Sequence, residues 1–277
     1  MNWYPAPGKL NLFLHVLGRR AEGEHAGYHE LQTVFRLIDR CDRVGIAPRS
    51  DGEIRFQGVY GEDNLVFKAA ALLKRETGAQ GGCDLALEKA LPVGGGLGGG
   101  SSDAATVLFT LNREWKLRLP PEKLRQIGVK IGADVPFFLL GSNALGEGIG
   151  EKLTPLDLPD AWYLVLEPQV SVSTKEIFQS ALTHRGKRLK IPPFFPGQGA
   201  NDLEPVVTAR YPEVRAQLEW LKQHRPQARL TGSGACVFAE FGDEAEARAL
   251  HSQLPGGMQG FVARGLERYP LGSRQAG

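Results

Sequence analysis

Residues 92–105 constrain this chain more than any other segment, because a dense glycine run there changes abruptly into a helical pattern. The run contains six glycines: Gly94, Gly95, Gly96, Gly98, Gly99 and Gly100. Glycine has no β-carbon and readily adopts positive φ angles, so successive backbone N–H groups can turn toward one ligand. The segment therefore predicts a loop that surrounds an anion. A flexible linker is disfavoured, because linkers seldom lead directly into a patterned helix.

A helix is expected directly after the glycine loop, with Ser101 or Ser102 as its N-cap. Its apolar face has i, i+3 and i+4 spacing and consists of Ala104, Ala105, Leu108, Leu111 and Trp115. The free N–H groups and partial positive charge of a helix start would act on the same anion, which favours phosphate. The motif is not a Walker A loop, because Ser101 stands where that loop has lysine, and a dinucleotide fingerprint is weak evidence among so many glycines.

The length and composition indicate a soluble protein of two domains. A chain of 277 residues exceeds the usual size of one domain, and 42% hydrophobic with 23% charged residues is typical of globular proteins. The 33 basic and 31 acidic residues nearly balance. We therefore expect no nucleic acid or other polyanionic partner.

The cysteines and the N-terminal segment indicate a reducing compartment. Cys41, Cys83 and Cys236 are far apart and lack metal-ligand spacing, which argues against a disulfide framework or a zinc site. Asn11 and His15 interrupt the apolar run at residues 10–17, and no cleavage site follows it, so a signal peptide is not expected. No stretch has the length needed to cross a membrane, and we expect the protein to be cytoplasmic.

Several polar side chains allow two interpretations each. Residues 10–16 alternate with period 2 and predict a half-buried strand, from which Lys9 and Asn11 would project side by side, either into solvent or into a site. Tyr28 and His29 are adjacent rings that either stack on a base or pack beside a turn. Asp134, the one acid in an apolar segment, is either a helix N-cap or a carboxylate at a pocket edge.

The remaining patterns predict two sheet-containing halves that meet at residues 156–160. Strands are expected at residues 44–47, 54–56 and 83–87 in the first half, with a helix capped by Asp63 or Asn64. In the second half, Ser173 and Glu176 form a capping-box signature. Strands are expected there at residues 162–166, 228–230, 235–241 and 260–266, with a small-residue turn at 231–234. A sheet covered by helices on one face fits this order.

Three motifs, in this order, resemble those of the GHMP small-molecule kinases: Pro7-Gly8-Lys9-Leu10-Asn11-Leu12, the glycine run, and Leu230-Thr231-Gly232-Ser233-Gly234-Ala235. Two further segments are Gly27-Tyr28-His29-Glu30-Leu31 and Gly132-Ala133-Asp134-Val135-Pro136. They narrow the resemblance to the GHMP family that acts on 4-diphosphocytidyl-2-C-methyl-D-erythritol in the non-mevalonate isoprenoid pathway. The resemblance spans nearly the whole chain.

The resemblance implies an α+β, two-domain GHMP kinase fold with the active site in the cleft between the domains. An N-terminal α/β ATP-binding domain would occupy residues 1–158, and a C-terminal ferredoxin-like domain residues 159–277. The implied activity is phosphorylation of the substrate's 2-hydroxyl by ATP, with Mg²⁺ as counter-charge. The expected partner is this small-molecule cytidine diphosphate substrate, and the expected state is a monomer or weak dimer.

The family's site residues are carried over onto matching positions of this sequence. The implied catalytic residues are Asp134, which would accept the hydroxyl proton, and Lys9, which would contact that hydroxyl and the carboxylate. The implied ATP-binding residues are Pro92, Val93, Gly94, Gly95, Gly96, Leu97, Gly98, Gly99, Gly100, Ser101 and Ser102. The implied substrate-binding residues are Asn11, Tyr28, His29, Thr174 and Phe178. The turn at Gly232, Ser233 and Gly234 would lie near the phosphates. Ser102 and Asp103 lie near enough in sequence to touch phosphate or metal, but no metal ligand is assigned.

The sequence departs from the family pattern at two places, and two alternative functions are open. Gly8 stands where alanine is usual, and the loop at residues 21–26 is longer than usual. Another GHMP kinase, acting on mevalonate, homoserine or a sugar, would not need the cytidine motif at residues 27–29. A nucleotide-binding regulatory protein without kinase chemistry would not need Lys9 and Asp134, and both are present.

Overall fold

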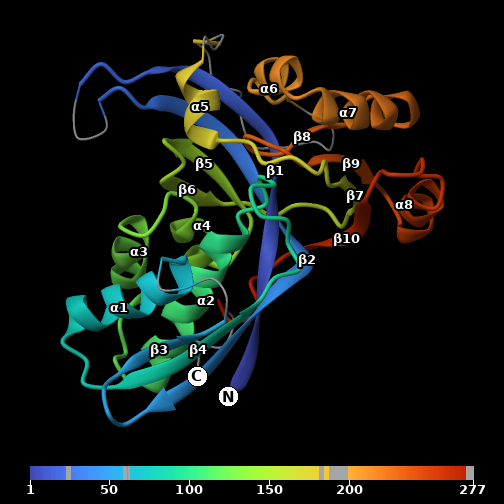
Figure 1. Ribbon diagram of the computed structural model, residues 1–277. Helices are drawn as coiled ribbons and strands as arrows, with labels where there is room; N and C mark the ends of the chain where they lie inside the picture. Colours follow the sequence, from blue (N-terminus) through green and yellow to red (C-terminus); the bar gives the residue numbers. More distant parts are fainter. Residues whose placement is uncertain (23–25, 59–60, 62, 181–183, 187–198, 273–277) are drawn as a thin grey trace.

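Two long antiparallel strands, β1 (Asn2–Arg19) and β2 (His29–Arg49), run through the whole molecule (Figure 1). The computed structural model describes residues 1–22, 26–58, 61, 63–180, 184–186 and 199–272. Of the long loop predicted at residues 21–26, positions 23–25 lie outside the described residues. The register of the pair shifts three times, once between Asn11 and Phe13. The two strands form a ribbon to which both halves of the chain attach.

The first half surrounds one end of this ribbon. Its elements are β3 (Ile54–Gln57), α1 (Leu65–Thr77), β4 (Gly82–Glu88), α2 (Gly99–Glu114), α3 (Pro121–Val129), α4 (Val135–Leu140), β5 (Ala144–Gly148) and β6 (Lys152–Pro155). Strands β4 and β5 pair antiparallel with β2, β3 runs parallel to β4, and β6 pairs with β5. Helix α2 is buried throughout residues 102–112, so it is enclosed rather than amphipathic.

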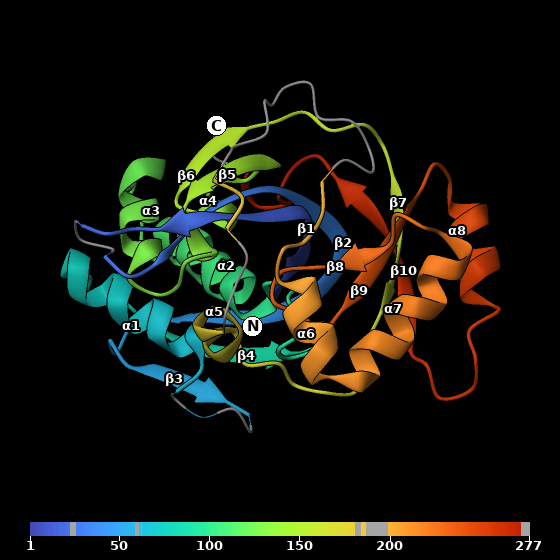
Figure 2. The ribbon, with the colours of Figure 1, turned by 90° about the horizontal axis from the view of Figure 1, so that it is seen from above.

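The second half has the βαββαβ order of a ferredoxin-like fold. Its elements are β7 (Trp162–Leu166), α5 (Thr174–Gln179), α6 (Glu204–Arg210), α7 (Pro212–His224), β8 (Arg229–Leu230), β9 (Val237–Phe241), α8 (Glu244–His251) and β10 (Gly260–Leu266). The antiparallel strand order is β10-β7-β9-β8, and β10 joins this sheet to β2. Figure 2 shows α6, α7 and α8 on one side of the molecule and α1 and α3 on the other.

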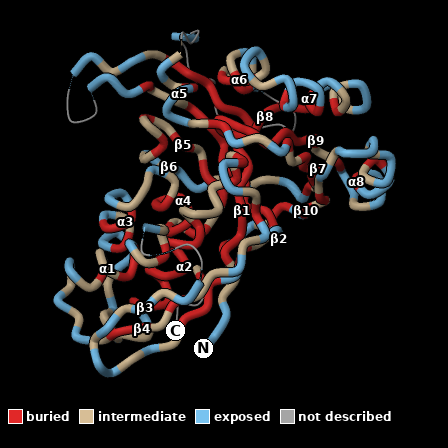
Figure 3. The backbone as a smooth tube through the Cα atoms, viewed as in Figure 1, coloured by how far each residue is buried: buried red, intermediate tan, exposed pale blue. Residues whose placement is uncertain are grey.

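The prediction of a half-buried first strand is wrong, because β1 is buried on both faces along residues 6–16. Figure 3 shows this as a continuous buried stretch of the ribbon. Loops from distant parts of the chain accept hydrogen bonds from backbone N–H groups of β1. The Lys9 backbone N–H donates to the Leu97 carbonyl (2.9 Å), and the Asn11 N–H donates to Thr231 Oγ1 (3.0 Å). Further along, the Leu14 N–H donates to the Ala200 carbonyl (3.0 Å).

The helix starts agree with the sequence at two positions and differ at one. Asn64 accepts a hydrogen bond from the Phe67 N–H (2.9 Å), and Ser173 accepts one from the Glu176 N–H (3.4 Å), as predicted. Neither Ser101 nor Ser102 caps α2, because the helix already begins within the glycine run and its N-cap is Gly98. Ser102 Oγ instead lies 3.1 Å from the buried Tyr269 hydroxyl.

The predicted boundary between residues 158 and 159 falls between β6 and β7 and stays a prediction. Among the described residues, no helix is both long and apolar enough to cross a membrane.

Candidate active site

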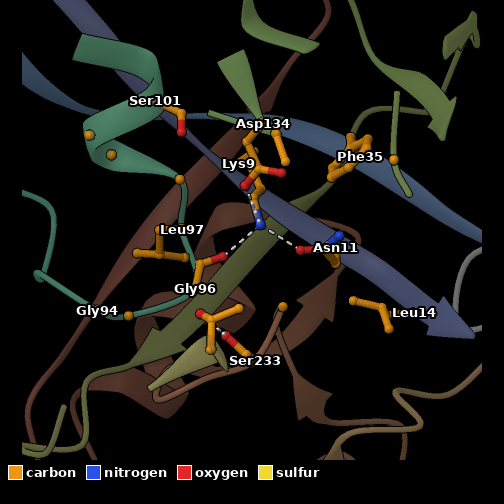
Figure 4. A pocket seen from close by; sticks show the side chains of 18 of the residues that line it. Lys9, Asn11, Leu14, Phe35, Gly94, Gly96, Leu97, Ser101, Asp134 and Ser233 are labelled. Carbon is orange, nitrogen blue, oxygen red and sulfur yellow. Dashed lines mark hydrogen bonds and ion pairs between the residues drawn. The ribbon is translucent and has the colours of Figure 1, made fainter. Parts of the chain in front are cut away.

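A cavity of about 600 Å³ lies where the ribbon meets the glycine loop, the start of α4, helix α5 and the turn at residues 231–234 (Figure 4). Its wall includes groups from both halves of the chain. Predicted site residues that line it include Lys9, Asn11, Asp134, Thr174, Phe178, Gly232, Ser233 and residues 92–101 of the glycine loop. Ser102 and Gly234 do not line it, and the Ser102 side chain is fully buried.

Hydrogen bonds that its carbonyl groups accept hold the glycine loop against residues 235 and 236. The Gly94 carbonyl accepts from the Ala235 N–H (3.0 Å), and the Gly95 carbonyl accepts from the Cys236 N–H (3.1 Å). Gly96 has a φ of +76°, and a β-carbon there would lie 2.3 Å from the Thr231 carbonyl oxygen. Glycine is therefore required at this close approach. The loop leads directly into the 16-residue helix α2, so its backbone and the positive end of the helix face one region.

Lys9 is a buried ammonium held by acceptors from three parts of the chain. Its Nζ donates to Asn11 Oδ1 (2.5 Å) and to the Gly96 carbonyl (2.7 Å), and it lies 3.7 Å from Asp134 Oδ2 (Figure 4). The residue is 3% exposed. Burial lowers the pKa of Lys9 below its ordinary value, and the Asp134 carboxylate opposes that shift. The predicted pairing of an ammonium and a carboxamide on one strand face is therefore present.

Asp134 stands at the N-cap position of α4, but its side chain makes no capping hydrogen bond. The carboxylate instead points to Lys9 and is 35% exposed at the cavity. Buried apolar residues of α4 fix its backbone, since Phe137 stacks on Phe35 with 4.7 Å between ring centroids. Of the two interpretations of Asp134, this geometry favours a carboxylate at a pocket edge.

A buried cluster of charged side chains lies beside Gly99 at the start of α2, and the sequence patterns did not predict it. Lys89 Nζ donates to carboxylate oxygens of both Asp42 and Asp103, and the distance to Asp103 is 3.0 Å. Burial raises the pKa of Asp103 to about 7, with Asp42 adding to the rise and Lys89 opposing it. One signal was available: Asp103 directly precedes the apolar face of α2, where a carboxylate would need a buried cation.

Three aromatic rings lie together beside α5, and one of them, Phe178, lines the cavity. The His29 and Phe178 ring centroids are 5.6 Å apart, and His184 contacts His29 edge-on at 5.5 Å. Burial lowers the pKa of His29, and the positive charges of Arg19 and His184 add to that shift. Tyr28 is 60% exposed and, like His29, is not among the groups that line the cavity. The structure therefore brings His29 and Phe178 together, with Tyr28 beside them on the surface.

A second missed residue, Asn201, fixes the turn at residues 231–234. Its Nδ2 donates to the Leu230 carbonyl (2.9 Å) and the Gly232 carbonyl (2.7 Å), and its Oδ1 accepts from the Leu203 N–H (2.9 Å). Nearby, Thr174 Oγ1 lies 2.7 Å from Ser233 Oγ. Asn201 acts across 29 residues of sequence, so no local spacing pointed to it.

Comparison with known proteins agrees with this architecture. The family model for the GHMP kinases N terminal domain matches residues 64–142, and the model for the GHMP kinases C terminal matches residues 196–258. The 4-diphosphocytidyl-2-C-methyl-D-erythritol kinase of Nitrosospira multiformis is 55% identical, over 96% of this chain and 92% of its own length. That of Thiobacillus denitrificans is 53% identical, over 97% of this chain and 96% of its own. The chain belongs to the 4-diphosphocytidyl-2-C-methyl-D-erythritol kinase family.

Two solved structures have a similar fold. A crystal structure of 4-(cytidine 5'-diphospho)-2C-methyl-D-erythritol kinase has a TM-score of 0.83 and 33% identity, covering 95% of this chain and 99% of that one. The homoserine kinase of Cytophaga hutchinsonii has a TM-score of 0.64 at 14% identity, covering 96% and 94%. The second likeness shows the fold alone. The two-domain GHMP kinase fold and the family predicted from the sequence are therefore confirmed.

The titration of Asp103 leads to a testable pH dependence of stability. Its pKa of about 7 in the folded state exceeds its ordinary value of 3.8, so the folded protein retains a proton that the unfolded chain releases. This contribution to the free energy of unfolding is complete below about pH 4 and is lost as the pH rises through about 7. We expect Asp103→Asn to flatten the pH dependence between about pH 4 and 7 in urea titrations. The exposed Asp160→Asn should not, and an unchanged Asp103→Asn profile would contradict the assignment.

Proposed function

We propose that this chain transfers the γ-phosphoryl group of ATP to the 2-hydroxyl of 4-diphosphocytidyl-2-C-methyl-D-erythritol. One observation carries the chemistry: a buried ammonium, Lys9, and a carboxylate, Asp134, lie 3.7 Å apart directly beside the glycine loop. The choice of substrate rests on relatives of that name that are 50–55% identical over nearly the whole chain. We propose the domain division at residues 158 and 159 and the monomeric or weakly dimeric state on the same resemblance.

The glycine loop fits the phosphates of ATP. Three of its glycines, Gly94, Gly96 and Gly98, have φ between +69° and +76°, and the loop ends at the N-terminus of a long helix. Such successive turns expose N–H groups to an anion. ATP would supply the phosphoryl group, and residues 92–101 would hold its phosphate chain. Gly232 and Ser233 also line the cavity, on the turn that packs against the glycine loop.

A magnesium ion fits the cavity chiefly through the phosphates. The described residues contain no cluster of three or more His, Cys, Asp or Glu side chains that could hold a metal. Mg²⁺ commonly takes one or two protein carboxylates and completes its shell with phosphate oxygens and water. Among the described residues, Asp134 is the one carboxylate that lines the cavity, and the proton transfer proposed below uses it, whereas Asp103 is buried against Lys89. The ion would neutralise phosphate charge, and we assign it no protein ligand.

Asp134 and Lys9 then have separate tasks. The Asp134 carboxylate accepts the proton of the substrate hydroxyl, because it is exposed to the cavity and not used as a cap. A carboxylate is a weak base, but phosphoryl transfer has a loose transition state in which positioning outweighs basicity. The Lys9 ammonium pairs with the Asp134 carboxylate at 3.7 Å and offsets negative charge at the transferring group. Its bonds to Asn11 and Gly96 fix the ammonium before substrate arrives.

The cytidine end of the substrate would lie against His29 and Phe178. Their rings are adjacent, and burial keeps His29 neutral at pH 7 by lowering its pKa. A neutral imidazole can donate and accept hydrogen bonds, as recognition of a pyrimidine edge requires. Thr174 adds a hydroxyl on the same wall. Tyr28 would contribute from the surface side, and Asn11 would contact the erythritol part.

The function is tested by measuring ADP release with a panel of acceptors. We expect turnover of 4-diphosphocytidyl-2-C-methyl-D-erythritol and none of mevalonate or homoserine, because these lack the cytidine that His29 and Phe178 would bind. A kinase for another GHMP substrate would show the reverse pattern. A nucleotide-binding protein without kinase chemistry would bind ATP and release no ADP with any acceptor.

Substitution of Asp134 tests the proton acceptor. We expect Asp134→Asn to lower kcat by about 10²- to 10⁴-fold, the usual contribution of a positioned general base. The dissociation constant for ATP, measured by calorimetry, should stay nearly the same. Asp157→Asn, on an exposed loop, is the matched control. An unchanged kcat in Asp134→Asn would refute the role.

Substitution of His29 tests the base pocket. Loss of a ring contact should raise KM for the cytidine substrate by about 3- to 10-fold while the KM for ATP stays constant. His224→Ala, which removes an exposed histidine on α7, should change neither constant. A rise in both KM values would place His29 outside a dedicated substrate pocket.

A further inference from the structure

Thr33 is a buried hydroxyl on β2 that neither the sequence motifs nor the proposed reaction uses. It lies beside Asn11 on the neighbouring strand, and the two residues are 1% and 3% exposed. Thr33 Oγ1 lies 2.5 Å from the Phe13 carbonyl oxygen and 2.8 Å from Asn11 Nδ2. Thr33 and Asn11 both line the cavity, and two polar groups meet this hydroxyl at the cavity wall, where each hydrogen bond needs a donor and an acceptor.

The hydrogen bonds at Thr33 have only one consistent direction. A carbonyl oxygen cannot donate, so the Thr33 hydroxyl hydrogen must go to the Phe13 carbonyl. The oxygen of Thr33 is then left as an acceptor, and its second partner must be an N–H group. Only the NH₂ end of the Asn11 carboxamide satisfies this, which settles which way the side chain of Asn11 faces.

The orientation of Asn11 in turn determines the surroundings of Lys9. With its NH₂ end on Thr33, Asn11 presents Oδ1 to the Lys9 ammonium at 2.5 Å. An ammonium has three N–H donors, and Lys9 has three acceptors around it: Asn11 Oδ1, the Gly96 carbonyl and the Asp134 carboxylate. If Asn11 turned over, its NH₂ group would face the ammonium, and two donors would meet.

We propose that Thr33 is a positioning residue of the kinase site, which fixes Asn11 so that Lys9 stays an ammonium between the glycine loop and Asp134. The proposal deepens the proposed function and rests on it. Thr33 acts through Asn11 and not on the reacting atoms. Two hydrogen bonds, through Asn11 and Lys9, and one ion pair connect Thr33 to the Asp134 carboxylate that accepts the substrate proton.

The environment of Lys9 makes its charge sensitive to this chain of contacts. The facing charged group is Asp134 at the start of α4, β2 contributes the ring of Phe35 at 5.8 Å, and β1 and the loop contribute Asn11 and the Gly96 carbonyl. Burial already favours the neutral amine of Lys9. Loss of one fixed acceptor therefore moves the balance toward the neutral form.

The decisive measurement is the titration of Lys9 itself, followed by the ¹³Cε chemical shift of labelled lysine, with Lys9→Arg used to assign the signal. We expect Thr33→Val, which keeps the shape but removes the hydroxyl, to move the Lys9 transition to lower pH by about half a unit or more. Thr33→Ser should restore it. Thr33→Ala serves as a second variant without a hydroxyl if Thr33→Val does not fold. An unmoved Lys9 transition in a folded variant without the hydroxyl overturns the proposal.

Thr106→Val is the matched control, because it also removes a buried hydroxyl, one bonded to Tyr269 and remote from Lys9. It should leave the Lys9 transition unchanged, and an equal shift there would mean that any loss of packing moves Lys9. In the kinase assay, Thr33→Val should lower kcat by about 10-fold with an unchanged KM for ATP. A raised KM for the acceptor substrate with an unmoved Lys9 transition would make Thr33 a direct substrate contact and refute the positioning role.

The two readouts separate this proposal from the proposed function. If the wild-type protein phosphorylates none of the acceptors, the proposed function fails. The titration of Lys9 in the variants still decides whether Thr33 controls that ammonium.

Discussion

The burial of one positive charge organises the centre of this molecule. An ammonium removed from water is unstable unless acceptors replace its hydration, and Lys9 meets this need with groups from β1, the glycine loop and the start of α4. The Gly96 carbonyl and the Asp134 carboxylate come from positions about 90 and 125 residues beyond Lys9 in the chain. The fold therefore has to bring the loop and α4 to the strand before the charge can be accommodated. The same contacts leave the Asp134 carboxylate beside the cavity, where chemistry can use it.

The glycine loop depends on this arrangement as much as on its own composition. Its carbonyl groups accept hydrogen bonds from Lys9 and from the backbone of residues 235 and 236, and these bonds hold the loop in place. A β-carbon at Gly96 would lie 2.3 Å from the Thr231 carbonyl oxygen, and one at Gly98 would lie 3.0 Å from the Phe138 ring. The glycines thus serve two needs, the turning of the backbone toward an anion and the close packing of the loop between both halves.

Local patterns in the sequence predicted the local structure well. The caps at Asn64 and Ser173, the strands of the ferredoxin-like sheet and the neighbouring positions of Lys9 and Asn11 follow from spacing alone. Long-range contacts were out of reach of that reasoning. The burial of both faces of β1 depends on the Leu97 carbonyl and the Thr231 hydroxyl, and the Lys89 cluster joins residues 42, 89 and 103. The family resemblance implied the roles of the site residues. It did not point to Asn201 or Thr33, which stand outside its motifs and act by holding backbone groups and other side chains.

The shared ribbon sets a mechanical condition on the cleft. Because β1 and β2 pass through both halves without interruption, the halves are not two bodies joined by a flexible tether. Any widening of the cleft has to bend a hydrogen-bonded two-stranded ribbon or displace the loops and α5 that close its rim. Lys9, Asn11 and Thr33 lie on the ribbon itself. Their mutual distances would therefore be kept if the cleft widened, and the ammonium would hold its position on the ribbon.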